Sequence, residues 1–184
     1  MPRVVPDELI AGALRLRPWR EDDVPDVFAA LQDPASRLWS GAGTVSREDA
    51  ALIVRIRMDR SLEDRAAWAV VDAAGTLLAS VSLHSIDRVQ ADAEIGYWTV
   101  PAARGRGVAP VAVDAACRWA FARLGIQRVE LCHAVENAAS ARVAEKAGFT
   151  LEGRLRRSYR YGDGRKHDEL LWARLSTDPA PAFG

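Results

Sequence analysis

The stretch that most constrains the fold is a predicted strand that runs through a glycine-rich turn directly into a predicted helix. Residues 94–100 read Glu-Ile-Gly-Tyr-Trp-Thr-Val, which is typical of a strand, and Pro101 stops it. The turn Arg104-Gly105-Arg106-Gly107 comes next, and an amphipathic helix is predicted from about Val108 to Leu124. A strand followed through a short turn by a helix indicates a mixed fold, in which helices pack on a sheet.

The same turn predicts a binding site for an anion such as a pyrophosphate. Gly105 and Gly107 let the backbone turn tightly and approach a ligand closely. The helix that follows offers unpaired N–H groups and the positive end of its dipole. Arg104 and Arg106 add guanidinium groups, each of which can bind two phosphate oxygens at once. The 184-residue chain has 25 Lys+Arg and 25 Asp+Glu, so this is local positive charge on a chain of zero formal net charge.

Two common phosphate-binding loops do not fit this turn. A Walker A loop ends in Gly-Lys-Ser or Gly-Lys-Thr, which the turn lacks. A dinucleotide-binding fingerprint needs Gly or Ala where this chain has Pro110, and an acidic residue that is not convincingly placed here. A plain strand-to-helix turn with surface arginines is the remaining alternative to an anion site.

The rest of the chain alternates between predicted helices and strands. A capping box at Ser46 and Asp49 opens one helix, and Gly148 is placed to end another. We expect an unstructured loop over residues 35–45, which contain Trp39, Gly41 and Gly43. The other elements are expected as strands at about residues 14–16, 68–71, 77–86 and 129–135, helices at about 21–33, 46–60 and 137–148, and a closing hairpin of residues 155–161 and 167–175.

Composition and charge exclude several classes of function. Hydrophobic residues make up 49% and charged residues 27%, as in a globular protein, and the longest apolar stretches are far too short for a membrane span. A pI near 6.8 without a basic face argues against nucleic-acid binding. Cys117 and Cys132 form no CxxC pair and are expected to be buried, so neither a disulfide nor a metal site is expected. The N-terminus does not read as a secretory signal, which favours a cytoplasmic location.

Several segments together resemble one protein family. Arg104, Gly107 and Ala109 form Arg-x-x-Gly-x-Ala, which resembles the coenzyme A pyrophosphate loop of the GNAT superfamily of N-acetyltransferases. The resemblance runs in order over roughly residues 13–176 and is strongest for the RimJ/RimL-like branch. It is carried by Leu-Arg-Leu-Arg-Pro-Trp-Arg-x-x-Asp at 14–23, Ala-Glu-Ile-Gly-Tyr-Trp at 93–98, Arg-Val-Glu-Leu at 128–131, Asn-Ala-Ala-Ser at 137–140, Glu-Lys-Ala-Gly-Phe at 145–149, Glu-Gly at 152–153 and Gly-Asp-Gly-Arg-Lys-His-Asp at 162–168.

The resemblance implies an α+β fold and acetyl-CoA as co-substrate. The fold would be a mixed, mostly antiparallel sheet of about seven strands with about four helices, splayed between its fourth and fifth strands, where acetyl-CoA lies. The strand before the turn would present backbone groups to the pantetheine arm, and an N–H near Trp98 to Val100 would stabilise charge on the thioester oxygen. The residues expected to bind the cofactor are Trp98, Thr99, Val100, Arg104, Gly105, Arg106, Gly107, Val108, Ala109 and Asn137.

Glu94 is the candidate base, and a structural carboxylate at the strand edge is the alternative. Period-two alternation places Glu94, Gly96, Trp98 and Val100 on one face of their strand. The position of Glu94 resembles that of the catalytic glutamate in the histone-acetylating branch of the superfamily. His84 is the other candidate base, because an imidazole titrates near neutral pH.

The candidate acid is Ser140, which lies on the predicted helix that starts at Asn137. Many family members carry a tyrosine acid on this helix, but Ala144 occupies the matching position here. Ser140 would protonate the leaving thiolate or position a water, or it is a plain surface serine. Asn137 would bind the cofactor arm or simply cap the helix. The aromatic residues that could line an acceptor pocket, or belong to the core, are Trp39, Trp68, Tyr97 and Trp98.

These features predict a cytoplasmic N-acetyltransferase that uses acetyl-CoA and works by direct attack of a primary amine. The acceptor would be a protein or peptide N-terminus, or a small-molecule amine such as an antibiotic. A non-catalytic acyl-CoA sensor is the alternative, favoured slightly by Ala144. We expect one domain over residues 1–184 with a core of about 13–176 and a frayed tail at 177–184, as a monomer or homodimer without metal, nucleic acid or membrane partners.

Overall fold

The computed structural model describes residues 6–40, 45–59, 61 and 63–183. Short 3-10 turns cover Glu21–Asp23 and Pro101–Ala103, and a π-turn covers Ala120–Leu124. The strands are β1 Leu9–Ala11, β2 Leu14–Arg17, β3 Ala66–Val71, β4 Leu77–Asp87, β5 Asp92–Thr99, β6 Arg128–Ala134, β7 Thr150–Arg160 and β8 Lys166–Leu175. The α-helices are α1 Val24–Ala30, α2 Pro34–Trp39, α3 Arg47–Met58, α4 Val108–Trp119 and α5 Ala138–Lys146.

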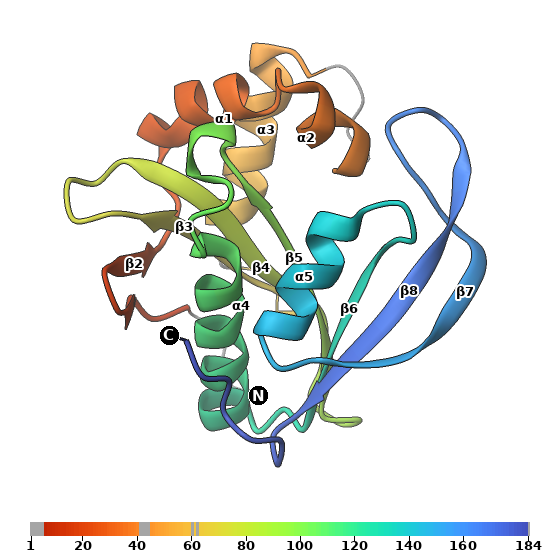
Figure 1. The fold of residues 1–184 in the computed structure, drawn as a ribbon. Coiled ribbons are helices and arrows are strands. Elements are labelled where there is room, and N and C mark those ends of the chain that lie inside the picture. The colour runs from red at the N-terminus through yellow and green to blue at the C-terminus, as the bar shows by residue number, and fades with distance from the viewer. Residues whose placement is uncertain (1–5, 41–44, 60, 62, 184) are drawn as a thin grey trace.

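All the described strands belong to one sheet that opens in its middle. Its order is β1-β2-β3-β4-β5-β6-β8-β7, and every neighbouring pair is antiparallel except β5 and β6. The parallel pair joins only Asp92–Glu94 to Arg128–Glu130, after which the two strands diverge (Figure 1). The predicted splayed, mostly antiparallel α+β sheet is therefore confirmed, with the split between β5 and β6.

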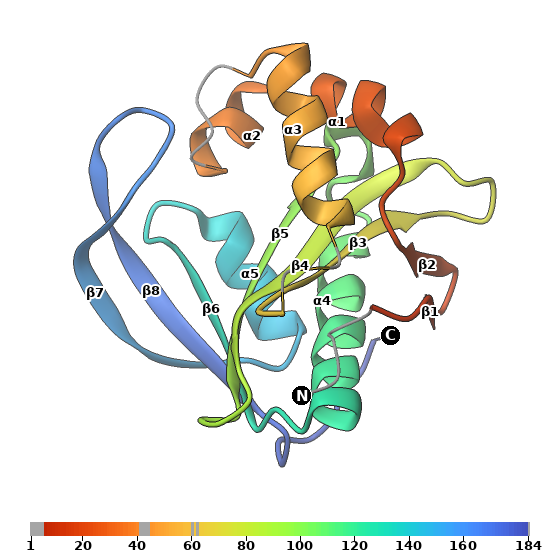
Figure 2. The ribbon, with the colours of Figure 1, turned by 180° about the vertical axis from the view of Figure 1, so that it is seen from behind.

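Helices cover both faces of the sheet (Figures 1 and 2). α4 packs on one face, where Val113 and Ala116 meet inward residues of β3, β4 and β5, and α5 lies beside α4. α1 and α3 pack on the opposite face, where Val27 and Val54 meet the other set of β3 residues. Because every residue of β3 is buried, its sequence Ala-Ala-Trp-Ala-Val-Val is apolar throughout.

α2 and the tip of the β7–β8 hairpin come together across the mouth of the split (Figure 1). The Gly162 N–H donates to the Leu38 carbonyl at 2.9 Å. A Cβ at Gly162 would lie 2.2 Å from the Arg37 carbonyl oxygen, so only glycine permits this approach. α2 begins at Asp33, whose side chain accepts a hydrogen bond from the Ser36 N–H, and Pro34 occupies its first turn.

Several expectations about the elements need correction. The sheet has eight strands rather than about seven, because β1 was not predicted, and five α-helices are described rather than about four. Residues 35–40 were expected in a loop but belong largely to α2; Gly41 and Gly43 lie outside the described residues. The first helix ends at Ala30, and Asp33 caps α2 instead of closing that helix. Cys132 is exposed, because it lies on the face of β6 that borders the split.

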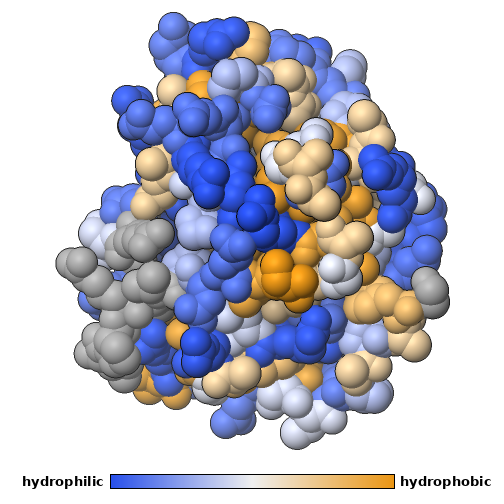
Figure 3. All heavy atoms as spheres, turned by 90° about the vertical axis from the view of Figure 1, so that its left-hand side faces the viewer, coloured by the Kyte–Doolittle hydropathy of each residue, from blue (hydrophilic) through white to orange (hydrophobic). Residues whose placement is uncertain are grey.

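The face that carries the β1–β2 edge of the sheet is mostly hydrophilic, with apolar residues gathered near its centre (Figure 3). Ile10 on β1 is 70% exposed, which is expected for a three-residue edge strand with one open side. Within the described ranges, no helix is long and apolar enough to cross a bilayer.

A buried ion pair joins the two halves of the sheet. Arg174 on β8 donates to the Asp114 carboxylate of α4 at 2.7 Å and to the Ala147 carbonyl at 3.1 Å. The two side chains are only 3% and 6% exposed. β8 lies on one side of the split and α4 packs mainly on the other, so this contact holds the halves together.

Asp114→Asn is expected to destabilise the protein by about 3–5 kcal/mol, because it leaves the buried Arg174 guanidinium without its counter-charge. Urea unfolding measures this loss. Arg118→Ala is the matched control: it removes a second partner of Asp114 that is 57% exposed, and should cost less than about 1 kcal/mol. Equal losses from both variants would contradict a clamping role for Arg174.

Candidate active site

The turn between β5 and α4 exposes the N-terminus of α4 to a large cleft. Gly105 and Gly107 have φ values of 74° and 77°, which strongly favour glycine. Gly107 is the N-cap of α4 and makes no side-chain cap hydrogen bond, so the first N–H groups of the helix have no capping side chain. A Cβ at either glycine would meet nothing within 4 Å, so the space over the turn is open.

The cleft has a volume of about 980 Å³ and runs from this turn into the split between β5 and β6. α2, α5 and the β7–β8 hairpin complete its walls. Most of the predicted cofactor residues line it, whereas Val100 and Arg106 do not. The predicted residues in its wall are Trp98, Thr99, Arg104, Gly105, Gly107, Val108, Ala109 and Asn137, together with Glu94 and Ser140.

The register of β4 and β5 decides which backbone N–H groups face the split. The Val100 N–H donates to the Leu78 carbonyl at 2.9 Å, so it is not available to a thioester oxygen. Hydrogen-bonded positions alternate along an antiparallel pair, so Trp98 also turns its backbone groups towards β4. The N–H groups of Tyr97 and Thr99 therefore point towards the split. Within the expected range of Trp98 to Val100, Thr99 is therefore the residue whose N–H faces the split, and Tyr97 just before that range is a second candidate.

Arg104 is held by α2. Its Nη2 lies 2.5 Å from Asp33 Oδ2 and 2.9 Å from Ser36 Oγ. The hydrogen bond from Arg104 is the largest of the effects that lower the pKa of Asp33 to about 2. The pair fixes α2 against the turn and leaves the guanidinium at the cleft wall. Arg106 is exposed and lies outside the cleft.

Glu94 and His84 face each other across β4 and β5. They are register partners, and Glu94 Oε2 lies 3.6 Å from His84 Nδ1. Partial burial lowers the pKa of His84, an effect that the Glu94 carboxylate opposes. A Cβ at Gly96 would lie 3.4 Å from His84 Nε2, so glycine there leaves room for the ring. The two candidate bases thus form one pair on one face of the sheet.

The predicted alternation along β5 is confirmed over the strand itself. Glu94 and Gly96 contact His84, and Trp98 packs beside Trp19 on the same face. Val100 is an exception, because the strand ends at Thr99 and Val100 packs against the core on the α4 side.

The other two histidines have structural partners. His133 is buried, donates from Nδ1 to the Ala134 carbonyl and accepts from Trp172 Nε1 at 3.0 Å. His167 lies 2.9 Å from Asp163 in the terminal hairpin, and its pKa is raised by that hydrogen bond. Of the three histidines, only His84 lies beside Glu94 and has no hydrogen bond to a described core residue.

Ser140 is paired with the phenol of Tyr97, which was expected either in an acceptor pocket or in the core. Its hydroxyl hydrogen bonds to the Tyr97 hydroxyl, because odd positions of β5 face α4 and α5. Burial raises the pKa of Tyr97 to about 12, so this phenol is protonated at neutral pH. Ala144 is completely buried and, as an alanine, carries no hydroxyl. Asn137 caps α5 by accepting from the Ser140 N–H at 3.2 Å.

The tryptophans divide between the cleft and the core. Trp39 and Trp98 line the cleft, and Trp39 packs edge-on against Tyr161 of the hairpin. Trp68 is fully buried and packs edge-on against Trp119, so it does not line an acceptor pocket.

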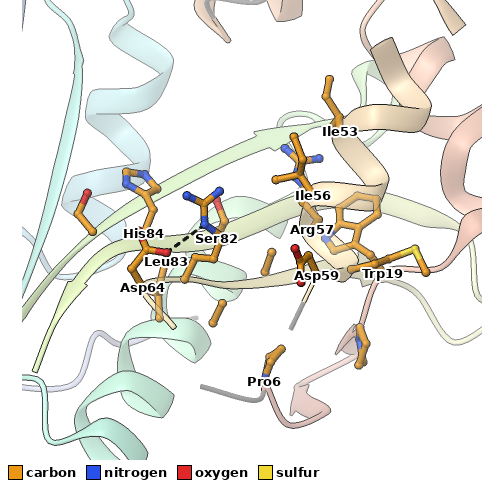
Figure 4. A pocket seen from close by; sticks show the side chains of 16 residues that line it. Pro6, Trp19, Ile53, Ile56, Arg57, Asp59, Asp64, Ser82, Leu83 and His84 are labelled. Carbon is orange, nitrogen blue, oxygen red and sulfur yellow. Dashed lines mark hydrogen bonds and ion pairs between the residues drawn. The ribbon is translucent and has the colours of Figure 1, made fainter. Parts of the chain in front are cut away.

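A second cavity of about 570 Å³ adjoins the cleft below α3 (Figure 4). Arg57, Ser82 and His84 line both spaces, so the Glu94–His84 pair lies where they meet. This cavity was not predicted from the sequence, because Trp19, Arg57 and Ser82 in its wall come from segments that are far apart along the chain. Among the described residues, no cluster of three His, Cys, Asp or Glu side chains could hold a metal ion.

Comparison with known proteins finds relatives among acetyltransferases. The chain is 38% identical over 108 residues to "Putative ribosomal N-acetyltransferase YdaF" of Bacillus subtilis (strain 168), which covers 56% of each chain. It is 31% identical over 88 residues to a spermidine N(1)-acetyltransferase of Vibrio cholerae serotype O1, covering 48% of this chain and 51% of that one. The matches thus span about half the length of these relatives.

The fold is similar to that of solved structures. Mycobacterium smegmatis RimJ in complex with CoA-disulfide superposes with a TM-score of 0.78 at 22% identity, covering 90% of this chain and 83% of that one. Residues 13–150 match the family described as "Acetyltransferase (GNAT) domain". Since this match covers about three quarters of the chain, the protein belongs to the GNAT acetyltransferase family.

Proposed function

We propose that this protein transfers the acetyl group of acetyl-CoA to a primary amine by direct attack, and that the amine belongs to a peptide or protein N-terminus or to a small molecule. The observation that carries the proposal is the continuous cleft. It joins an uncapped helix N-terminus, an open pair of strands and the Glu94–His84 pair. The relatives described as ribosomal and spermidine acetyltransferases support an amine acceptor.

The residues present fit coenzyme A. The N–H groups at Gly107, Val108 and Ala109 suit the negative charge of a pyrophosphate, and Arg104 lies beside them. Tyr97 and Thr99 offer their N–H groups along the split, where an extended pantetheine arm can pair as an added strand. Acetyl-CoA supplies the activated thioester. Asn137 Nδ2 is left to donate to the arm, because its Oδ1 already caps α5.

Three groups of this chain divide the chemistry. Glu94, directly or through a water, accepts the proton that an ammonium acceptor must lose before it attacks. An N–H of Tyr97 or Thr99 stabilises the negative charge that develops on the thioester oxygen. The Tyr97 hydroxyl donates to Ser140, which leaves the Ser140 O–H to donate to the departing sulfur. The new C–N bond replaces the C–S bond. An ammonium acceptor loses two protons in all: Glu94 accepts the first and passes it to solvent, and the second, lost after attack, balances the proton that Ser140 gives to sulfur and regains from solvent.

The Tyr97–Ser140 pair weakens the case for a non-catalytic sensor. That case depended on Ala144 in place of a tyrosine, and the structure provides a hydroxyl from β5 instead. Thiol release from acetyl-CoA with a panel of peptides and small amines tests the proposal. Binding of acetyl-CoA without thiol release on any amine would contradict it.

The exposed free thiol of Cys132 suits a reducing compartment such as the cytoplasm.

Arg104→Ala is expected to weaken coenzyme A binding by about 1–3 kcal/mol, because a guanidinium that meets phosphate is lost. Calorimetric titration with coenzyme A measures this. Asp33→Asn is the control: it breaks the same ion pair but keeps the guanidinium, so it should leave affinity unchanged or increase it. If Asp33→Asn weakens binding as much, the effect comes from the loss of α2 and not from phosphate.

Glu94→Gln is expected to lower kcat/KM by about 10²–10⁴ if Glu94 is the base. The pH profile separates this from the alternative. The Glu94 charge raises the pKa of His84, so its removal lowers that pKa further. If His84 were the base, Glu94→Gln would therefore keep most of the activity and shift the acid limb of kcat/KM to lower pH.

Ser140→Ala is expected to lower kcat by about 10²-fold, because the departing sulfur loses its proton donor. The KM for acetyl-CoA should change little. Tyr97→Phe should cause a smaller loss in kcat, because it removes only the partner that orients Ser140. Steady-state kinetics with a reactive amine measure both. Unchanged kcat in Ser140→Ala would exclude Ser140 as the donor.

A further inference from the structure

The cavity below α3 has a reactive end and a cationic end. His84 lies at one end, Arg57 and Trp19 lie at the other, and Ser82 lies between them (Figure 4). Arg57 extends from α3, whereas His84 and Ser82 extend from β4. Because His84 is paired with Glu94, a molecule that fills this cavity would reach from the proposed base to Arg57.

Two buried donors at the cationic end have no acceptor. Arg57 Nη1 and Trp19 Nε1 are both buried and have no hydrogen-bond partner among the described residues, while Arg57 as a residue lines the cavity. The Arg57 guanidinium carbon lies 5.0 Å from the Trp19 ring centre, so the donors belong to neighbouring groups. A buried donor without an acceptor destabilises the protein, and a charged donor does so more strongly than a neutral one.

The positive charge of Arg57 is not neutralised within the described part of the chain. No ion pair among the described residues involves Arg57. Burial lowers the pKa of its guanidinium to about 10, and no carboxylate opposes this effect. The group remains protonated at neutral pH. Its nearest aromatic neighbours are Trp19 and Trp98, with Trp98 at 5.7 Å. These rings stabilise the cation, but they accept no conventional hydrogen bond from it.

The other charged groups of the cavity already have partners. Arg65 Nε lies 3.3 Å from Asp64 Oδ1, and Asp59 Oδ1 accepts from the Ser61 N–H. The groups without a partner at the Trp19 end are therefore both hydrogen-bond donors, and one of them, Arg57, carries a positive charge. A ligand that completes it must bring acceptor oxygens and negative charge.

We propose that the acceptor amine carries a carboxylate, which Arg57 binds with its planar fork while Trp19 and Trp98 form the wall beside it. The amine would then lie at the Glu94–His84 end. This placement of the amine rests on the proposed acetyl transfer, whereas the carboxylate site stands independently of it. A guanidinium binds a carboxylate through two parallel N–H···O bonds, which gives orientation as well as affinity.

The same charge disfavours a polyamine in this cavity. A second cationic group of such an acceptor would lie against Arg57, and two like charges in a partly buried site repel. Arg57 is thus a specificity-determining residue, distinct from the Glu94–His84 pair that handles protons.

The binding test uses a matched pair of probes, an N-acetyl amino acid and its C-terminal amide, because these differ only in the carboxylate. Tryptophan fluorescence titration reports binding without turnover, since Trp19 and Trp98 border the site. The native protein should bind the acid at least about 10-fold more tightly than the amide, and Arg57→Gln should bind both alike. Arg57→Lys keeps the charge without the fork and should show an intermediate preference.

Arg55→Gln is the control variant, because Arg55 is exposed on the same helix and should leave the preference intact. Thermal unfolding of each variant confirms that it folds; if Arg57→Gln does not fold, Arg57→Lys still tests the fork. Equal binding of acid and amide by the native protein would overturn the proposal, as would an undiminished preference in Arg57→Gln or Arg57→Lys.

Turnover separates this inference from the proposed function. With free amino acids and their amides as acceptors, the native enzyme should favour the acids in kcat/KM, mainly through KM, and Arg57→Gln should remove the difference. If the acid preference appears in binding but no amine is acetylated, the proposed acetyl transfer fails while the carboxylate site holds. A native enzyme that prefers spermidine to every acid-bearing amine would overturn the carboxylate site.

Discussion

The Arg174–Asp114 ion pair joins two halves of a sheet that backbone hydrogen bonds join over only three residue pairs. β5 and β6 separate after Glu94 and Glu130, which leaves the inner edge of each strand unpaired. An open edge inside a sheet is costly unless something else holds the halves and something else uses the backbone groups. The first need is met by α4, α5 and Arg174. The second is met, on our proposal, by the pantetheine arm.

The split also places the proposed acid and the proposed base on opposite sides of β5. Odd positions of β5 face α4 and α5, where Tyr97 meets Ser140, and even positions face α3, where Glu94 meets His84. The proposed acid and base therefore lie on opposite faces of one strand. A thioester in the split lies between them, so the thiol can leave on one side while the amine arrives on the other. This two-sidedness follows from the period of a strand and needs no movement of the backbone.

Much of the fold and of the proposed cofactor site could be predicted from local pattern. The turn at Arg104–Gly107, the capping box at Ser46 and the cap at Asn137 are short-range features, and the structure contains each of them. α2 was missed because its signal, Asp33 followed by Pro34, was interpreted as the end of the preceding helix. Cys132 was wrongly placed inside because apolar alternation does not reveal that a strand borders an open split.

The sequence by itself determined most of the elements, the glycine turn and the family, because backbone conformation, caps and apolar periodicity depend on neighbouring residues. It could not determine pairings between distant segments. Tertiary structure brought Tyr97 to Ser140, 43 positions away. It also paired the Val100 N–H with the Leu78 carbonyl, and it placed Arg57 beside Trp19 without a counter-charge. Those contacts depend on register and on helix docking, which no local pattern encodes. The proposed site for acetyl-CoA could therefore be inferred from the sequence, whereas the proposed acceptor site could be inferred only from the folded chain.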